Sequence, residues 1–141
     1  MEFSSKLENS TFKSAPEVGS LMLFRYQAAT AEKRYYDQNP LCYVLIDLNN
    51  VFYGMNLHYY PPNQRMAVIN MLQEAEKEGV REWEKFLFGS TGFHKYLKSE
   101  VMSNYLDVAM DDWQTAIMLP AEDFVRTIRG VKFPVSLRSI W

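Results

Sequence analysis

The sequence predicts an α+β fold: a small antiparallel sheet, or an SH3-like partial barrel, with an inserted helical block. Short apolar runs typical of strands come first, Asn49-Asn50 separates two of them as a hairpin turn would, and helix-spaced apolar residues follow. The chain has 141 residues, 48% of them hydrophobic, which is enough for one core. We therefore expect a mobile N-terminal arm at 1–17, a single α+β domain at 18–130 and a basic C-terminal tail at 131–141.

Three strands are expected before the helices, at 21–26, 41–48 and 51–60, with a long loop at 27–40. Asn residues tolerate the positive φ angles that a hairpin between the last two strands requires. Alternation divides the third strand into two faces. The face expected in the core carries Val51, Tyr53, Met55, Leu57 and Tyr59. The mixed face, expected to meet something other than bulk water, carries Phe52, Gly54, Asn56, His58 and Tyr60.

The helical block follows Pro61-Pro62, which ends the third strand. Helical spacing predicts one helix that runs to Gly79, with Val68, Ile69, Leu72 and Ala75 on its buried side. The same spacing predicts a short helix at 80–87 and a third helix at 93–108. A short strand at 115–119 and a helix that begins at Pro120 complete the expected order.

Aromatic residues make up 15% of the chain, a high share for its length. Many fit a small core, and that is one interpretation of the whole set. The other is that several lie at protein contacts, where aromatic residues and Arg are enriched. The residues predicted for such contacts are Phe3, Phe12, Tyr35, Tyr36, His58, Tyr60, Arg138 and Trp141.

Catalytic signatures are missing from the sequence. It has no phosphate-binding loop, dinucleotide fingerprint, nucleophile elbow or HExxH pair, and neither histidine has an identifiable partner nearby. The single cysteine, Cys42, lies in an apolar run and is expected to be a buried thiol. We therefore expect no enzyme activity, cofactor or metal site. A small metal-dependent hydrolase that uses Asp107, Asp111 and Asp112 remains an alternative.

Charge is nearly balanced, with 15 Lys and Arg against 17 Asp and Glu, which argues against a generally basic nucleic-acid binder. Residues 124–141 are different, because they contain no acidic side chain and four basic ones, Arg126, Arg129, Lys132 and Arg138. A basic tail of this kind docks on an acidic protein or, alternatively, on nucleic acid. No apolar run approaches the ~20 residues that a membrane helix needs, and no secretory signal is seen, so we expect synthesis in a cytoplasm and no membrane partner.

Three segments resemble small virion proteins of contractile-tailed bacteriophages: Tyr35–Leu41 (YYDQNPL), Gly54–Pro62 (GMNLHYYPP) and Leu119–Phe124 (LPAEDF). The resemblance implies a structural or adaptor protein of a phage tail, baseplate or neck. Its partners would be other protein subunits, it would be oligomeric in the assembly, and it would be found in the virion after synthesis in the host cytoplasm. The alternative is a phage protein that associates with nucleic acid through the basic tail and the mixed hairpin face.

Overall fold

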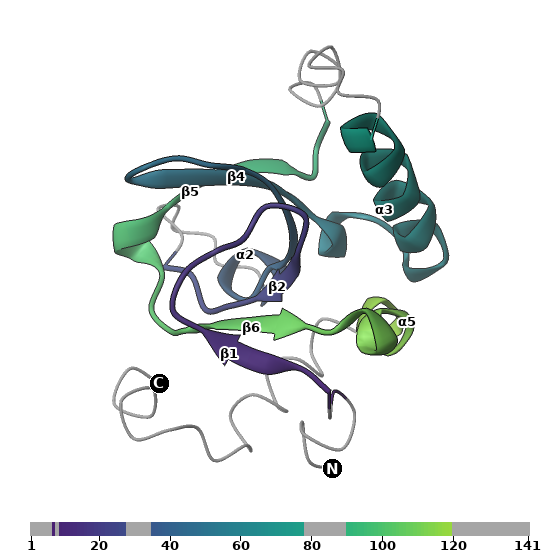
Figure 1. The fold of residues 1–141 in the computed structure, drawn as a ribbon, viewed down its shortest axis with the longest axis horizontal. Helices are drawn as coiled ribbons and strands as arrows, with labels where there is room; N and C mark the ends of the chain where they lie inside the picture. Colours follow the sequence, from purple (N-terminus) through teal and green to yellow (C-terminus); the bar gives the residue numbers. More distant parts are fainter. Residues whose placement is uncertain (1–6, 8, 28–34, 78–89, 120–141) are drawn as a thin grey trace.

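The computed structural model describes residues 7, 9–27, 35–77 and 90–119. They form a six-stranded sheet in which every paired strand is antiparallel, together with helices, so the predicted α+β class is confirmed (Figure 1). The strand order is β1-β6-β2-β3-β4-β5. The strands are β1 (Thr11–Lys13), β2 (Leu21–Leu23), β3 (Leu41–Asp47), β4 (Val51–Asn56), β5 (Phe93–Leu97) and β6 (Tyr105–Val108).

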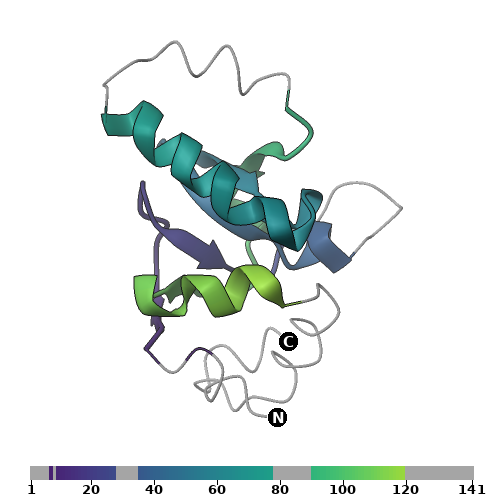
Figure 2. The ribbon, with the colours of Figure 1, turned by 90° about the vertical axis from the view of Figure 1, so that its right-hand side faces the viewer.

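Helices connect and cover these strands. They are α2 (Tyr35–Gln38), α3 (Pro62–Lys77) and α5 (Trp113–Met118), with 3-10 turns η1 (Leu57–Tyr59), η2 (Lys98–Glu100) and η3 (Met110–Asp112). Proline suits the first turn of α3, where its missing N–H has no helical acceptor. Helices α3 and α5 contact each other and lie together over one face of the sheet (Figure 2).

The sheet curls, and a buried cluster lies on each of its two sides. The convex face packs against α3 and α5, where Ile69, Leu72 and Ile117 join the core. Inside the curl lies a second cluster rich in aromatic rings: Met22, Phe24, Cys42, Val44, Phe52, Tyr96 and Tyr105. Strands β4 and β5 lie on one side of this curl and β6 and β1 on the other (Figure 1). The Tyr26–Val101 bridge and the hydrogen bond from Leu97 N to the Tyr26 hydroxyl (3.0 Å) partly close it.

Several local predictions are wrong, and long-range pairing explains most of them. The expected helix at 93–108 is β5, η2 and β6, because these segments complete their backbone hydrogen bonds with β4, β2 and β1. The expected strand at 115–119 is largely α5, and residues 35–38 form α2 within the expected loop. The third strand ends at Asn56, whose side chain accepts a hydrogen bond from His58 N and begins η1.

The expected N-terminal arm is a further correction. Residues 11–13 form β1 on the edge of the sheet beside β6, and Leu7 is 2% exposed within the core. Asn9 and Ser10 bind the Asp112 carboxylate, which joins this segment to η3. The expected helices at 80–87 and from Pro120, and the tail at 131–141, lie outside the described residues. Within the described ranges, no helix has the length and apolar character needed to cross a membrane.

Candidate functional site

One accessible surface combines aromatic rings with a lysine. It lies on the side of the β4–β5 ladder that faces away from the curl, and we call it the β4–β5 outer face. Antiparallel register places Val51 opposite Leu97 and Tyr53 opposite Lys95, and paired residues project from the same side of a sheet. The outer face consists of Val51, Tyr53, Phe93, Lys95 and Leu97.

The rings of Tyr53 and Phe93 stack on each other. Their centroids are 5.7 Å apart and their planes differ by 20°. Both side chains are half-buried, Lys95 is exposed, and Leu97 is 41% exposed. The surface therefore offers an aromatic pair with a cation directly across the ladder.

Lys95 is available for an external partner. Lys13 pairs with Asp107 at 2.6 Å, and Lys98 pairs with Asp47 at 2.7 Å. Lys95 makes no ion pair with any other residue that the structure describes. Among the residues described, none therefore competes with an external anion for its ammonium group.

Two glycines position this surface. A Cβ atom on Gly54 would overlap the Cys42 thiol and lie 2.7 Å from the carbonyl oxygen of Tyr43, so β4 lies flush against β3 only with glycine there. A Cβ on Gly92 would lie 2.9 Å from Met55 Sδ. The carbonyl of Gly92 accepts a hydrogen bond from Asn56 N at 2.7 Å, which starts the β4–β5 ladder and places Phe93.

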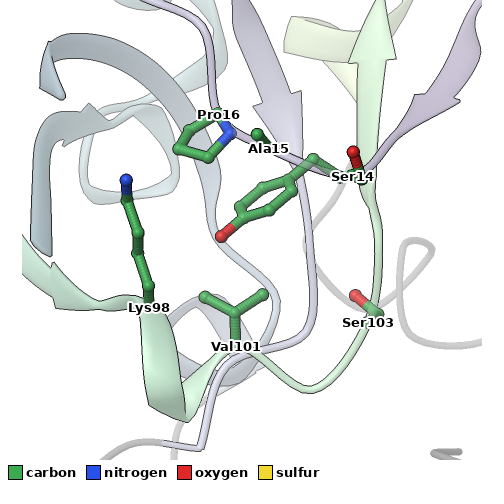
Figure 3. A pocket seen from close by; sticks show the side chains of 7 residues that line it. Ser14, Ala15, Pro16, Lys98, Val101 and Ser103 are labelled. Atoms are coloured by element: carbon green, nitrogen blue, oxygen red, sulfur yellow. The ribbon is translucent and has the colours of Figure 1, made fainter. Parts of the chain in front are cut away.

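A pocket of about 210 Å³ lies elsewhere, lined by Ser14, Ala15, Pro16, Lys98, Val101, Ser103 and Tyr105. Figure 3 shows Lys98 and Ser103 on opposite sides of it. Lys98 Nζ donates to the Leu48 carbonyl at 2.6 Å and pairs with Asp47. The Ser103 hydroxyl accepts from Arg25 N and donates to the Asn104 carbonyl. Because these polar groups are engaged within the protein, the outer face is the stronger candidate.

The structure does not gather the predicted contact residues into one surface. Phe12 lies in β1 and packs against the core, and His58 is only 8% exposed. Tyr60 is half-buried, and its hydroxyl donates to Met55 Sδ of β4 at 3.4 Å. Tyr35 and Tyr36 belong to α2. Phe3, Arg138 and Trp141 lie outside the residues described.

The core face expected for the third strand is confirmed at Met55 and Leu57, which are buried in the core, but the exposure of other positions differs from the prediction. Phe52, Gly54 and Asn56 on the expected mixed face are buried, because the curl encloses that side. Tyr53, expected in the core, is half-exposed. Reasoning from sequence also missed Phe93 and Lys95, although the order Phe-His-Lys-Tyr-Leu at 93–97 places them two residues apart, the spacing of one strand face.

Burial first, and the charge of Arg65 second, lower the pKa of His58 to about 3, against an opposing backbone hydrogen bond with Asn39. Unfolded His58 titrates near its ordinary 6.5, so between pH 6.5 and 3 the unfolded chain binds the extra proton. The contribution of neutral His58 to the free energy of unfolding is therefore fully present above pH 6.5. It is lost as the pH falls from 6.5 towards 3, by up to about 1.4 kcal/mol per pH unit.

We therefore expect His58→Gln to flatten the fall in unfolding free energy between pH 6.5 and 4, measured by urea denaturation at several pH values. His94→Gln, which changes the other histidine, is the matched control. Parallel pH curves for the wild type and His58→Gln would contradict the assignment.

Two of the three aspartates of the metal alternative have other partners. Asp107 pairs with Lys13, and Asp112 accepts hydrogen bonds from Asn9 N at 3.0 Å and the Ser10 hydroxyl at 2.9 Å. Asp111 is exposed. In the described part of the chain, no group of three His, Cys, Asp or Glu is arranged to hold a metal ion.

Comparison with known proteins identifies the family. Residues 3–141 match the family model described as phage T4 terminal DNA protecting protein. No curated protein and no solved structure matches the chain. The match confirms a bacteriophage protein but corrects the tail, baseplate or neck interpretation, because the family is described by terminal DNA and not by assembly. The chain belongs to the phage T4 terminal DNA protecting protein family.

Proposed function

We propose that this protein binds the ends of phage DNA and shields them from exonucleases. The observation that carries the proposal is the family match, which extends over residues 3–141 and therefore over almost the whole chain. The family match agrees with a phage protein that associates with nucleic acid and does not agree with a structural adaptor.

Charge distribution supports DNA binding despite a net charge of −2. The cations of residues 124–141 are concentrated in a segment without acids, and phosphate contacts by such residues supply most sequence-independent affinity. The β4–β5 outer face adds the exposed Lys95 and the Tyr53–Phe93 rings. A basic segment together with an aromatic surface is a common combination in proteins that bind nucleic acid without sequence preference.

We propose that protection works by binding alone and requires no bond cleavage by this chain. A bound protein blocks an exonuclease by occupying the terminus that the enzyme must engage. We further propose that the protein stays with the packaged DNA in the virion. Immunoblots of purified, nuclease-treated particles test this location, and absence of the protein from them would contradict it.

Purified protein is expected to slow exonuclease digestion of blunt linear duplex DNA once it is present at about one molecule per DNA end. The same exonuclease acting on a nicked circle should be unaffected, because a nick exposes no free duplex end. Doubling the DNA length at a constant number of ends should leave the required protein concentration unchanged. The digestion rate and the protein concentration required for protection are both measured from the loss of full-length DNA on gels.

Raising the salt concentration should weaken protection, because cations compete for the phosphates. Equal slowing of digestion on the linear and nicked substrates would contradict end protection. A protein requirement that scales with total base pairs would do the same, since it would indicate coating along the duplex.

A further inference from the structure

We propose that the β4–β5 outer face caps a DNA end by stacking the terminal base pair against the Tyr53–Phe93 pair, with Lys95 contacting a terminal phosphate. The inference rests on the proposed function and specifies how an end is distinguished from the rest of the duplex. No acidic residue belongs to the outer face, so its charge suits DNA.

Recognition of an end requires a feature that the interior of a duplex lacks. Inside a duplex both faces of every base pair are covered by neighbouring pairs. At a terminus one face is exposed to water. An aromatic ring that stacks on it binds any sequence, because every base has a π-face.

The two rings are held in place before any ligand binds. Phe93 packs against the core on the convex side of the sheet, and Tyr53 lies opposite Ile46 of β3, which packs against the same core. Tyr53 and Phe93 also support each other through their 5.7 Å stacking contact. Stacking a base pair on an ordered pair of rings therefore costs little side-chain entropy.

Lys95 adds a positive charge that can contact a terminal phosphate. It lies directly opposite Tyr53 in the ladder and is exposed. A base pair over the rings places its own sugar-phosphate strands at the margins of the outer face, within the range of a long lysine side chain. Leu97 and Val51 continue the surface beyond Lys95 with apolar area.

The test compares two duplexes of equal sequence, one with blunt ends and one with both ends closed by hairpin loops. The blunt duplex carries 2-aminopurine at its terminal position, whose fluorescence reports stacking. We expect the full-length protein to prefer the blunt duplex and to change the terminal fluorescence. Tyr53→Leu and Phe93→Leu should each weaken blunt-end binding by about tenfold, because a base–aromatic stack is typically worth that much.

Tyr53→Phe keeps the ring and should retain wild-type affinity, whereas Lys95→Gln should weaken binding by severalfold and reduce its salt dependence. Phe12→Leu removes a half-buried ring at the opposite sheet edge, and Lys77→Gln removes an exposed lysine from α3; both should bind as the wild type does. Circular dichroism melting of each variant establishes that it is folded.

Each outcome bears on a different proposal. Failure of the wild type to bind either duplex overturns DNA-end binding altogether. Equal affinity for blunt and closed duplexes overturns the stacking surface. So does a preference for blunt ends that survives in folded Tyr53→Leu and Phe93→Leu. Neither result decides the protection of DNA ends, which the exonuclease assay tests separately. Loss of binding in Tyr53→Phe as large as in Tyr53→Leu also overturns stacking, since it would assign the effect to the hydroxyl.

Discussion

Replacing Arg65 with alanine is expected to lower the free energy of unfolding by about 4 kcal/mol, because buried carbonyl groups would lose their donors. Arg65 is 5% exposed in α3. Its Nε atom donates to the carbonyls of Leu57 (2.9 Å) and Tyr60 (2.8 Å). Its Nη1 atom donates to Ile117 (2.7 Å) and Leu119 (3.4 Å).

This side chain links the turn that follows β4 to the end of α5. Two of its acceptors lie around η1, where the chain leaves β4, and two lie at the end of α5, where helical carbonyls lack partners. Burial lowers the pKa of Arg65, but its ordinary value is high enough that the guanidinium stays charged. The charge is thus solvated by backbone carbonyls.

Urea denaturation followed by circular dichroism measures the effect. Gln64→Ala, at the exposed neighbouring position of α3, is the matched control and should change stability by less than about 0.5 kcal/mol. Arg65→Lys should lie between the two, because one ammonium lacks the planar fork that reaches both sets of carbonyls. Equal stability of Arg65→Ala and Gln64→Ala would show that the four hydrogen bonds contribute nothing net.

The second large effect is expected for Gly54→Ala, which should destabilise the fold by about 3 kcal/mol through overpacking. The added methyl would overlap the Cys42 thiol, which a rotamer change can move, and the Tyr43 carbonyl oxygen at 2.7 Å, which belongs to the backbone of β3. Relief of the second contact requires β3 and β4 to separate. Tyr53 lies next to Gly54, so DNA-end binding should weaken as well.

A double-mutant cycle separates the two contacts. Cys42→Ala alone measures the loss of the buried thiol, and Cys42→Ala combined with Gly54→Ala should recover about 1 kcal/mol relative to additivity. Thermal and urea unfolding provide the measurement. Full additivity would mean that the thiol overlap is not part of the cost, and a neutral Gly54→Ala would contradict the close packing of β3 against β4.

Local signals were sufficient for the centre of the chain. Alternating apolar residues, the Asn49-Asn50 turn and the helical spacing after Pro62 predicted β3, β4 and α3, because each pattern is set by neighbours within a few residues. The buried thiol of Cys42 was also predicted, and its pKa is raised by burial. The phage origin followed from sequence motifs, whereas the function within the phage did not.

Residues 93–108 show where local reasoning fails. Phe93, Tyr96 and Leu97 fit helical spacing, yet 93–97 also alternates between the outer face and the curl. Both patterns are satisfied by one sequence, and the choice depends on backbone partners in β4 that lie about 40 residues earlier. The intrinsic preference of residues for helix or strand is a weak guide to secondary structure when such pairing partners are available.

The sequence by itself therefore determined the fold class, the hairpin and the long helix, since these depend on short-range periodicity and turn residues. Only the tertiary structure decided that Tyr53 is accessible, that His58 is enclosed and that Phe93 stacks on Tyr53. The exposure of these side chains depends on which face of the sheet the curl encloses and on how much of the other face α3 covers. Those are properties of strand pairing and packing, which bring together residues that no local pattern connects.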